Sequence, residues 1–176
     1  MKNHSILNIF TLLIILFLPV LLLAEINSSS TSSKRYTDNR NGTVTDNKTG
    51  LIWLKKANCL GRQTWHNAQL NVARLGDGQC GLTDGSISGT WRLPSKAEWR
   101  AMVDKRYLAP ALSNATGQET WTEGDLFFGV QSYNYWSATT FVFITPNAWI
   151  MNLYYGNLLD YHKSLFCNVW PVRDGE

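Results

Sequence analysis

The chain has 176 residues, with 16 lysines and arginines against 13 aspartates and glutamates, and it contains eight tryptophans, seven tyrosines and seven phenylalanines. A net charge of +3 is too small to indicate a nucleic-acid partner, so we predict none. The aromatic content predicts one compact domain, because large rings supply buried area and exposed rings supply binding platforms.

The first residues have the features of a targeting segment. Lys2 and His4 precede an almost unbroken apolar run over residues 6–23, and the small residue Ala24 follows it. This pattern predicts a signal peptide over residues 1–24 and an exported protein that is periplasmic, on the cell surface or secreted. The alternative is an uncleaved membrane anchor, since the run is long for a signal peptide. We expect the protein to contact a membrane only if this segment stays uncleaved. No cysteine follows the run, which excludes a lipoprotein anchor.

A linker and a group of strands are expected next. Residues 25–34 are rich in serine and lack periodicity, which indicates a flexible linker before one domain over residues 35–176. Turn residues then separate short extended segments, the first turn being Asn41-Gly42. The strands expected in this part cover residues 35–38, 43–45 and 51–54.

The first expected helix follows Thr64, which is a favourable N-cap. Trp65, Ala68, Val72 and Leu75 would form one buried stripe, and Gly76 would stop the helix. His66 falls off this stripe, so we expect it in solvent rather than at a ligand site. A loop rich in glycine, aspartate and serine should follow, up to residue 89.

The second helix is predicted by a more specific pattern within the segment Trp91-Arg92-Leu93-Pro94-Ser95-Lys96-Ala97-Glu98-Trp99. Pro94 ends an extended stretch, and Ser95 and Glu98 have the spacing of a capping box. A helix should therefore begin near Lys96.

The remainder predicts irregular structure and then strands. Residues 109–129 lack periodicity, and strands are expected over residues 133–143, 149–155, 158–161 and 168–173. The order of strands, two helices and strands predicts an α+β domain with mainly antiparallel strands, in which the two terminal segments pair. We expect the following residues in its core: Trp53, Trp65, Trp91, Leu93, Trp99, Trp136 and Trp149.

Three cysteines permit three pairings within an exported protein. Cys59 and Cys80 flank the first helix and can close a loop of about 20 residues, so we predict this disulfide. Cys167 is left over, either as a small buried hydrophobe or available to a partner. A catalytic cysteine beside His66 or His162 is not favoured, because no third orienting group is evident.

Several segments together resemble the Lcl C-terminal domain family, an exported bacterial module named for a collagen-like adhesin. The resemblance covers about residues 35–173, and the segments that carry it are Tyr36-Thr37-Asp38-Asn39, Asn41 to Trp53, Thr64-Trp65 with Ala68, Trp91-Arg92-Leu93-Pro94, Tyr135-Trp136-Ser137-Ala138-Thr139, Ala148-Trp149 and Val172-Arg173. The resemblance implies a fold similar to C-type lectins and to formylglycine-generating enzymes. It also implies that the family's collagen-like adhesin, which looks like a trimeric binder of sulfated glycosaminoglycans, is the functional precedent. This chain lacks the collagen-like repeats, so trimerisation does not follow and a homo-oligomer is only one alternative.

We therefore predict a non-catalytic recognition or adhesion module whose partner is an extracellular glycan such as a sulfated polysaccharide. Aromatic rings can stack on sugars, and cations can contact sulfates. The candidate contacts are Tyr133, Tyr135, Tyr154, Tyr155, Tyr161, Lys163, Lys55 and Lys56. The alternative is a structural component of the bacterial envelope that binds a protein partner.

Catalytic and metal functions are less favoured by the sequence. The least favoured alternative is an enzyme related to the formylglycine-generating proteins, which use reactive cysteines, because the sequence offers no close thiol pair near its C-terminal strands. Glu123 and Asp125 are a local acid pair, but no other catalytic group accompanies them. The Asn39-to-Gly42 turn does not fit a calcium loop, and Thr145-Pro146-Asn147 lacks the acid of the lectin calcium motif. We predict no enzyme activity and no cofactor, with a calcium site elsewhere left open.

Overall fold

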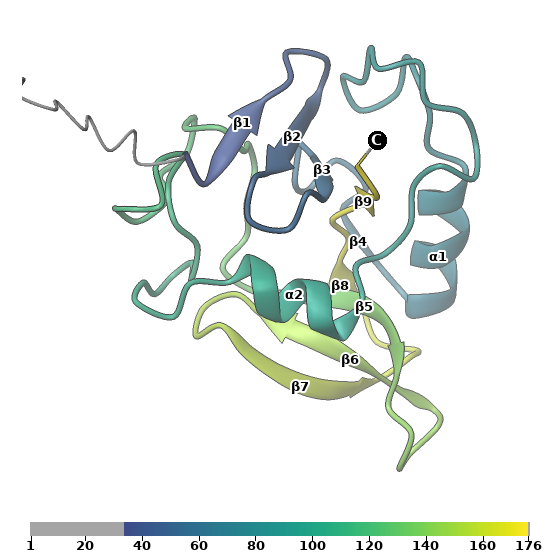
Figure 1. Cartoon of the computed structure of the whole chain (residues 1–176). Coiled ribbons are helices and arrows are strands. Elements are labelled where there is room, and N and C mark those ends of the chain that lie inside the picture. The colour runs from purple at the N-terminus through teal and green to yellow at the C-terminus, as the bar shows by residue number, and fades with distance from the viewer. Residues whose placement is uncertain (1–33, 176) are drawn as a thin grey trace, which may run out of the picture. The chain divides into compact units, whose positions relative to one another are not determined.

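Two sheets and two helices make up the part of the chain that the computed structural model describes, which is residues 34–175 (Figure 1). The expected signal peptide, and the linker before Lys34, lie outside the described residues. The first sheet has the order β1 (Tyr36–Asp38), β2 (Thr43–Asp46), β3 (Ile52–Leu54) and β9 (Val172–Arg173). The second has the order β4 (Arg62–Gln63), β8 (Cys167–Asn168), β5 (Asn134–Thr140), β6 (Asn147–Asn152) and β7 (Asn157–His162).

Pairing in the two sheets is antiparallel except between β5 and β8, which are parallel at Tyr135 and Asn168. The expected α+β class with mainly antiparallel strands is confirmed. Near the chain ends, Trp53 of β3 faces Val172 of β9, which confirms that the terminal segments pair.

The segment over residues 168–173, expected as one closing strand, is divided between the two sheets. Cys167–Asn168 pairs in the second sheet, and Val172–Arg173 pairs in the first. Pro171 has no N–H to continue a ladder, and Trp170 turns into the core, where its indole N–H donates to the Leu54 carbonyl at 2.8 Å. A single-strand prediction was therefore wrong here.

Helix α2 (Lys96–Met102) begins at the predicted capping box. The Glu98 N–H donates to Ser95 Oγ at 3.2 Å, and the Ser95 N–H donates to Glu98 Oε2 at 2.7 Å. Arg92 donates to both carboxylate oxygens of Glu98 at 2.8 Å. Burial alone would raise the pKa of Glu98, but the hydrogen bonds from Arg92 and Ser95 outweigh it, so the pKa lies below its usual value. The ion pair between Arg92 and Glu98 and the capping box thus fix the start of α2 to the extended segment before it.

Helix α1 (Trp65–Ala73) follows the prediction less closely. Thr64 occupies the N-cap position, but its side chain makes no capping hydrogen bond. The helix stops before Leu75, whose N–H donates to the Val72 carbonyl in a tighter turn. Ala68 and Val72 are buried, and His66 is exposed as predicted.

Indole and phenol rings fill the space between the sheets and α2. Trp53, Trp99 and Trp170 contact one another, with ring centroids 5.2–6.0 Å apart. The Trp99 N–H donates to the Trp136 carbonyl at 2.9 Å. The expected core residues Trp53, Trp91, Leu93, Trp99 and Trp136 are all buried.

Trp65 and Trp149 were expected in the core, but both are only partly buried. Trp65 packs against the core, so its prediction is confirmed in part, whereas the prediction for Trp149 was wrong. Each indole instead carries a lysine on its face: Lys163 Nζ lies 4.3 Å from the Trp65 ring centroid, and Lys96 Nζ lies 3.3 Å from that of Trp149. The attraction between an ammonium group and the ring face stabilises each indole outside the core.

The aromatic core, both sheets and the disulfide described below are all formed by residues within 34–175, which constitute one compact unit. This part of the chain therefore contains the interactions that a folding domain needs.

Candidate functional site

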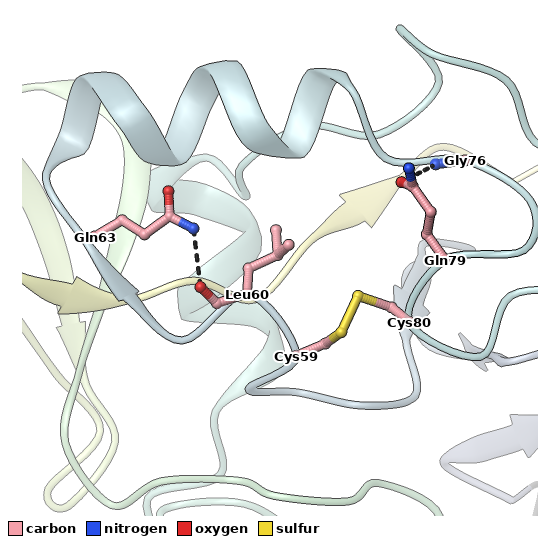
Figure 2. Close-up of a disulfide and its surroundings, with 6 residues drawn as sticks. All are labelled: Cys59, Leu60, Gln63, Gly76, Gln79 and Cys80. Atoms are coloured by element: carbon pink, nitrogen blue, oxygen red, sulfur yellow. Dashed lines mark hydrogen bonds between the residues drawn. A yellow bond between two sulfur atoms is a disulfide. The ribbon is translucent and has the colours of Figure 1, made fainter.

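A disulfide organises the surface next to the candidate site. Cys59 and Cys80 are bonded, which confirms the prediction, and the bond joins the segment before α1 to the loop after it (Figure 2). The loop is also held at Gly76, whose N–H donates to the Gln79 side chain at 3.2 Å. The loop lies close to the turn between β1 and β2. A Cβ added to Gly42 would lie only 2.3 Å from the Gly81 carbonyl oxygen, so the two backbones are in contact. Two segments distant in sequence are thereby fixed beside each other.

A groove with a volume of about 560 Å³ lies along the ends of strands β4, β5, β7 and β8. We name it the amide groove. Its lining residues are Asn58, Arg62, Gln131, Tyr133, Asn134, Tyr161, Phe166 and Asn168. Among these described residues there are four side-chain amides, three aromatic rings and one cation, and no carboxylate.

The amide groups of this groove are ordered by the sheet. Asn152 donates to Asn134 Oδ1 at 2.8 Å, and Asn168 donates to the Asn134 carbonyl at 3.1 Å. Asn58 Oδ1 is buried and has no hydrogen-bond partner among the described residues. Because an unpaired buried acceptor is costly, this oxygen favours a site that receives a donor from outside the chain.

Exposed rings surround the amides. Tyr133 is 70% exposed, Phe166 is 54% exposed and Tyr161 is 37% exposed. No hydrogen bond within the described residues engages the hydroxyl of Tyr133 or of Tyr161. Arg62 donates to the Phe166 carbonyl at 2.7 Å and makes no ion pair among the described residues, so its charge is open to a ligand.

A second hollow of about 340 Å³ contains the predicted lysine pair. We name it the lysine hollow, and its lining residues are Asp38, Arg40, Gly42, Lys55, Lys56, Cys80, Gly81 and Phe128. Lys55 is neutralised by Asp38 at 2.7 Å, and this contact helps to lower the pKa of Asp38 although burial opposes the shift. Lys56 and Arg40 are exposed and carry no ion pair within residues 34–175.

The two hollows are joined by a third, lined by Lys56, Asn58, Cys59, Phe128 and Gly129. It shares Asn58 with the amide groove and Lys56 with the lysine hollow. One continuous surface, which we call the binding track, therefore runs from Tyr133 and Arg62 past the disulfide to Lys56 and Arg40. It joins aromatic rings, amides and cations, which suits a polar polymer more than a compact apolar ligand.

The structure separates the other predicted contacts from this track. Tyr135 is fully buried, and its hydroxyl accepts the Gln131 N–H at 2.8 Å, so the prediction that Tyr135 contacts a ligand was wrong. Its side chain packs against Trp99 and Trp170. It faces the core because side chains alternate along β5.

Three further candidates also lie outside the track. Tyr154 and Tyr155 contact each other edge to face near the turn between β6 and β7, at the opposite end of that hairpin from Tyr161. Lys163 lies over Trp65 and donates to Thr140 Oγ1 and the Thr145 carbonyl, which places its ammonium group beside the β5–β6 connection and not on the track.

The residues considered for catalysis have structural contacts. Glu123 accepts the Gly129 N–H at 2.9 Å, and Asp125 accepts the Ala115 N–H at 2.9 Å, so each carboxylate fixes a loop. Cys167 is buried and unpaired, and burial raises the pKa of its thiol to about 12, an effect that Arg62 only partly opposes. Between residues 34 and 175 no three histidine, cysteine or acidic side chains are grouped as metal ligands. No helix in the same range is long and apolar enough to cross a membrane.

Most of the amide groove has no signature in the local sequence. Asn58, Gln131, Asn134, Phe166 and Asn168 come from separate segments that only the sheet order brings together. One signal was available, since asparagine is uncommon in strands and occurs in or beside the expected strands at residues 134, 152 and 168.

The fold and the site together define a small, disulfide-bonded α+β domain with a polar surface track. The model of the Lcl C-terminal domain family matches residues 42–173, about three quarters of the chain. The chain therefore belongs to the Lcl C-terminal domain family, as its sequence motifs indicate. No curated protein matches the chain.

Proposed function

We propose that this domain is an exported, non-catalytic recognition module that binds a glycan along the binding track. The observation that carries the proposal is the amide groove, where exposed rings stand beside ordered side-chain amides and an unpaired buried acceptor. Amides both donate to and accept from sugar hydroxyls, and rings offer flat apolar faces to pyranose carbons. Membership of a family named for an adhesin, and a disulfide suited to an oxidising compartment, support export and adhesion.

Sulfated polysaccharide is the glycan class that the charges of the track favour. Arg62, Lys56 and Arg40 carry no ion pair within the described residues, and the hollows that connect them share lining residues. A sulfated chain could place sugars against Tyr133 and Tyr161 and sulfates against these cations. Arginine binds such oxyanions through two N–H groups at once.

Binding without a divalent metal and without catalysis is part of the proposal. Glu123 and Asp125 accept hydrogen bonds from backbone N–H groups, and the pKa of the Cys167 thiol is raised. Both observations support a non-catalytic role for these residues. We further infer a scaffold like that of C-type lectins. The antiparallel pairing of β3 with β9, which joins the two terminal segments of the domain, supports this inference.

Two pairs of exposed tyrosines permit a matched test. Replacing Tyr133 and Tyr161 by alanine should weaken glycan binding by about tenfold or more, because these rings line the amide groove. Replacing Tyr154 and Tyr155, which are 43% and 56% exposed but lie outside the track, should leave binding unchanged. A glycan array with residues 25–176, with and without calcium, measures both.

Equal loss in the two double variants, or no loss in either, would reject the amide groove as the site. If the domain bound no glycan but captured an envelope protein through Tyr133 and Tyr161, the alternative of a protein-binding envelope component would replace the proposal. The melting temperature of each variant should stay near that of the unaltered domain, because all four rings are exposed.

A further inference from the structure

The connection between β5 and β6, residues 141–146, extends beyond the rest of the domain (Figure 1). Three consecutive apolar side chains stand at its end: Val142 is 74% exposed, Phe143 is 84% exposed and Ile144 is 51% exposed. We call these three residues the apolar tip. Single exposed apolar residues are ordinary on a protein surface, but three in a row on a protruding turn have no role in the core.

Backbone hydrogen bonds hold this turn in one shape. The Phe141 N–H donates to the Asn147 carbonyl at 2.9 Å, the Ile144 N–H donates to the Phe141 carbonyl at 3.2 Å, and the Asn147 N–H donates to the Ile144 carbonyl at 2.8 Å. The apolar tip is therefore presented by a defined turn, which reduces the entropy lost when it binds.

Aromatic rings and lysines lie directly behind the apolar tip. Phe141 contacts Phe143 with ring centroids 5.5 Å apart and Trp149 with ring centroids 5.0 Å apart. Lys96 covers Trp149, and Lys163, which covers Trp65, donates to the Thr145 carbonyl at 2.9 Å. Two tryptophan–lysine pairs thus stand at the base of the turn.

We propose that the apolar tip inserts into the surface of a lipid bilayer that contains anionic lipids. Valine, phenylalanine and isoleucine would enter the boundary of the acyl chains, and the tryptophan–lysine pairs would lie at the level of the headgroups, where indoles and lysines are favoured. Charge complementarity supports this occupant, because residues 140–149 contain no carboxylate. The acid packed against this turn is Asp160, which accepts a hydrogen bond from Asn147 at 2.7 Å.

A second protein molecule fits the apolar tip less well. Stable protein interfaces bury about 1,200–2,000 Å² and need a broad complementary patch. Three side chains on a convex turn offer much less area, whereas a bilayer closes around a convex tip without a matching surface. The site is separate from the binding track, so it does not depend on glycan recognition.

Flotation of residues 25–176 with vesicles of phosphatidylcholine and phosphatidylglycerol in equal parts tests the proposal. This fragment omits the apolar run of residues 6–23, which would itself bind lipid. The double variant Val142→Ser with Phe143→Ser should weaken partitioning by roughly tenfold for each side chain, because each loses its apolar contact with lipid. Insertion should also raise the surface pressure of a phosphatidylglycerol monolayer, and the increase should persist in high salt.

Ile87 gives a matched control, since it is 74% exposed and lies in a different loop. Ile87→Ser should float like the unaltered domain. Equal loss in Ile87→Ser, unchanged flotation of the double variant, or an absence of flotation by the unaltered domain would overturn the proposal. Concentration-dependent self-association that the double variant abolishes, without flotation, would show an interface between copies instead.

Discussion

Replacement of Trp99 by alanine should cost about 3–5 kcal/mol of the free energy of unfolding and leave much of the protein unfolded or aggregated. Trp99 is fully buried between Trp53, Trp170 and Tyr135, and its N–H group is paired with the Trp136 carbonyl. Alanine would leave a cavity among these rings and an unsatisfied carbonyl on β5. Urea unfolding followed by circular dichroism measures the loss.

Trp149→Ala is the control for this substitution. Trp149 is only partly buried, so its loss should destabilise the domain much less than the loss of Trp99. A Trp99→Ala protein that melts near the unaltered temperature would show that Trp99 does not fill the core between α2 and the sheets.

Removal of the disulfide by Cys59→Ser with Cys80→Ser should cost on the order of 3 kcal/mol, because the bond spans 21 residues and restricts the unfolded chain. The loop around Gly81 should also loosen from the β1–β2 turn and disturb the lysine hollow. Thermal unfolding of the variant measures the first effect, and heparin retention measures the second.

A reducing agent separates this effect from damage by the substitutions themselves. It should lower the melting temperature of the unaltered domain toward that of the double serine variant and leave the variant unchanged. If non-reducing peptide mapping linked Cys167 to either Cys59 or Cys80, the assignment of the disulfide would be contradicted.

Most parts of the fold that sequence reasoning predicted well depend on local chemistry. The capping box of Ser95 and Glu98 and the glycine-containing turns follow from residues close together in sequence. The pairing of the two terminal segments is a long-range feature, and the order of strands and helices along the chain predicted it. Burial was harder to predict for rings, because Trp65 and Trp149 each have a lysine over the ring face while Trp53 and Trp99 fill the core. Composition alone does not distinguish these two uses of an indole.

The candidate site was predicted only in part. Lys56, Tyr133 and Tyr161 lie on the binding track, but Tyr135 has the opposite orientation on its strand and Lys163 is engaged by Trp65. The amide groove depends on β8 lying between β4 and β5, which no local pattern reveals. Long-range strand order therefore limits what the sequence alone can say about the site.

Recognition of a sulfated glycan by the binding track can be measured by salt-gradient elution of residues 25–176 from a heparin column. We expect the domain to be retained longer than an inert protein of similar charge without added calcium, and to be released by salt, because exposed charges are screened beyond about 8 Å at physiological ionic strength. A variant with Lys56→Glu and Arg62→Glu should elute earlier, because two cations of the track are lost. Charge reversal at Lys48, which is exposed but outside the track, should change the elution less. Elution of the unaltered domain with the inert protein, or equal shifts in the two variants, would contradict the claim.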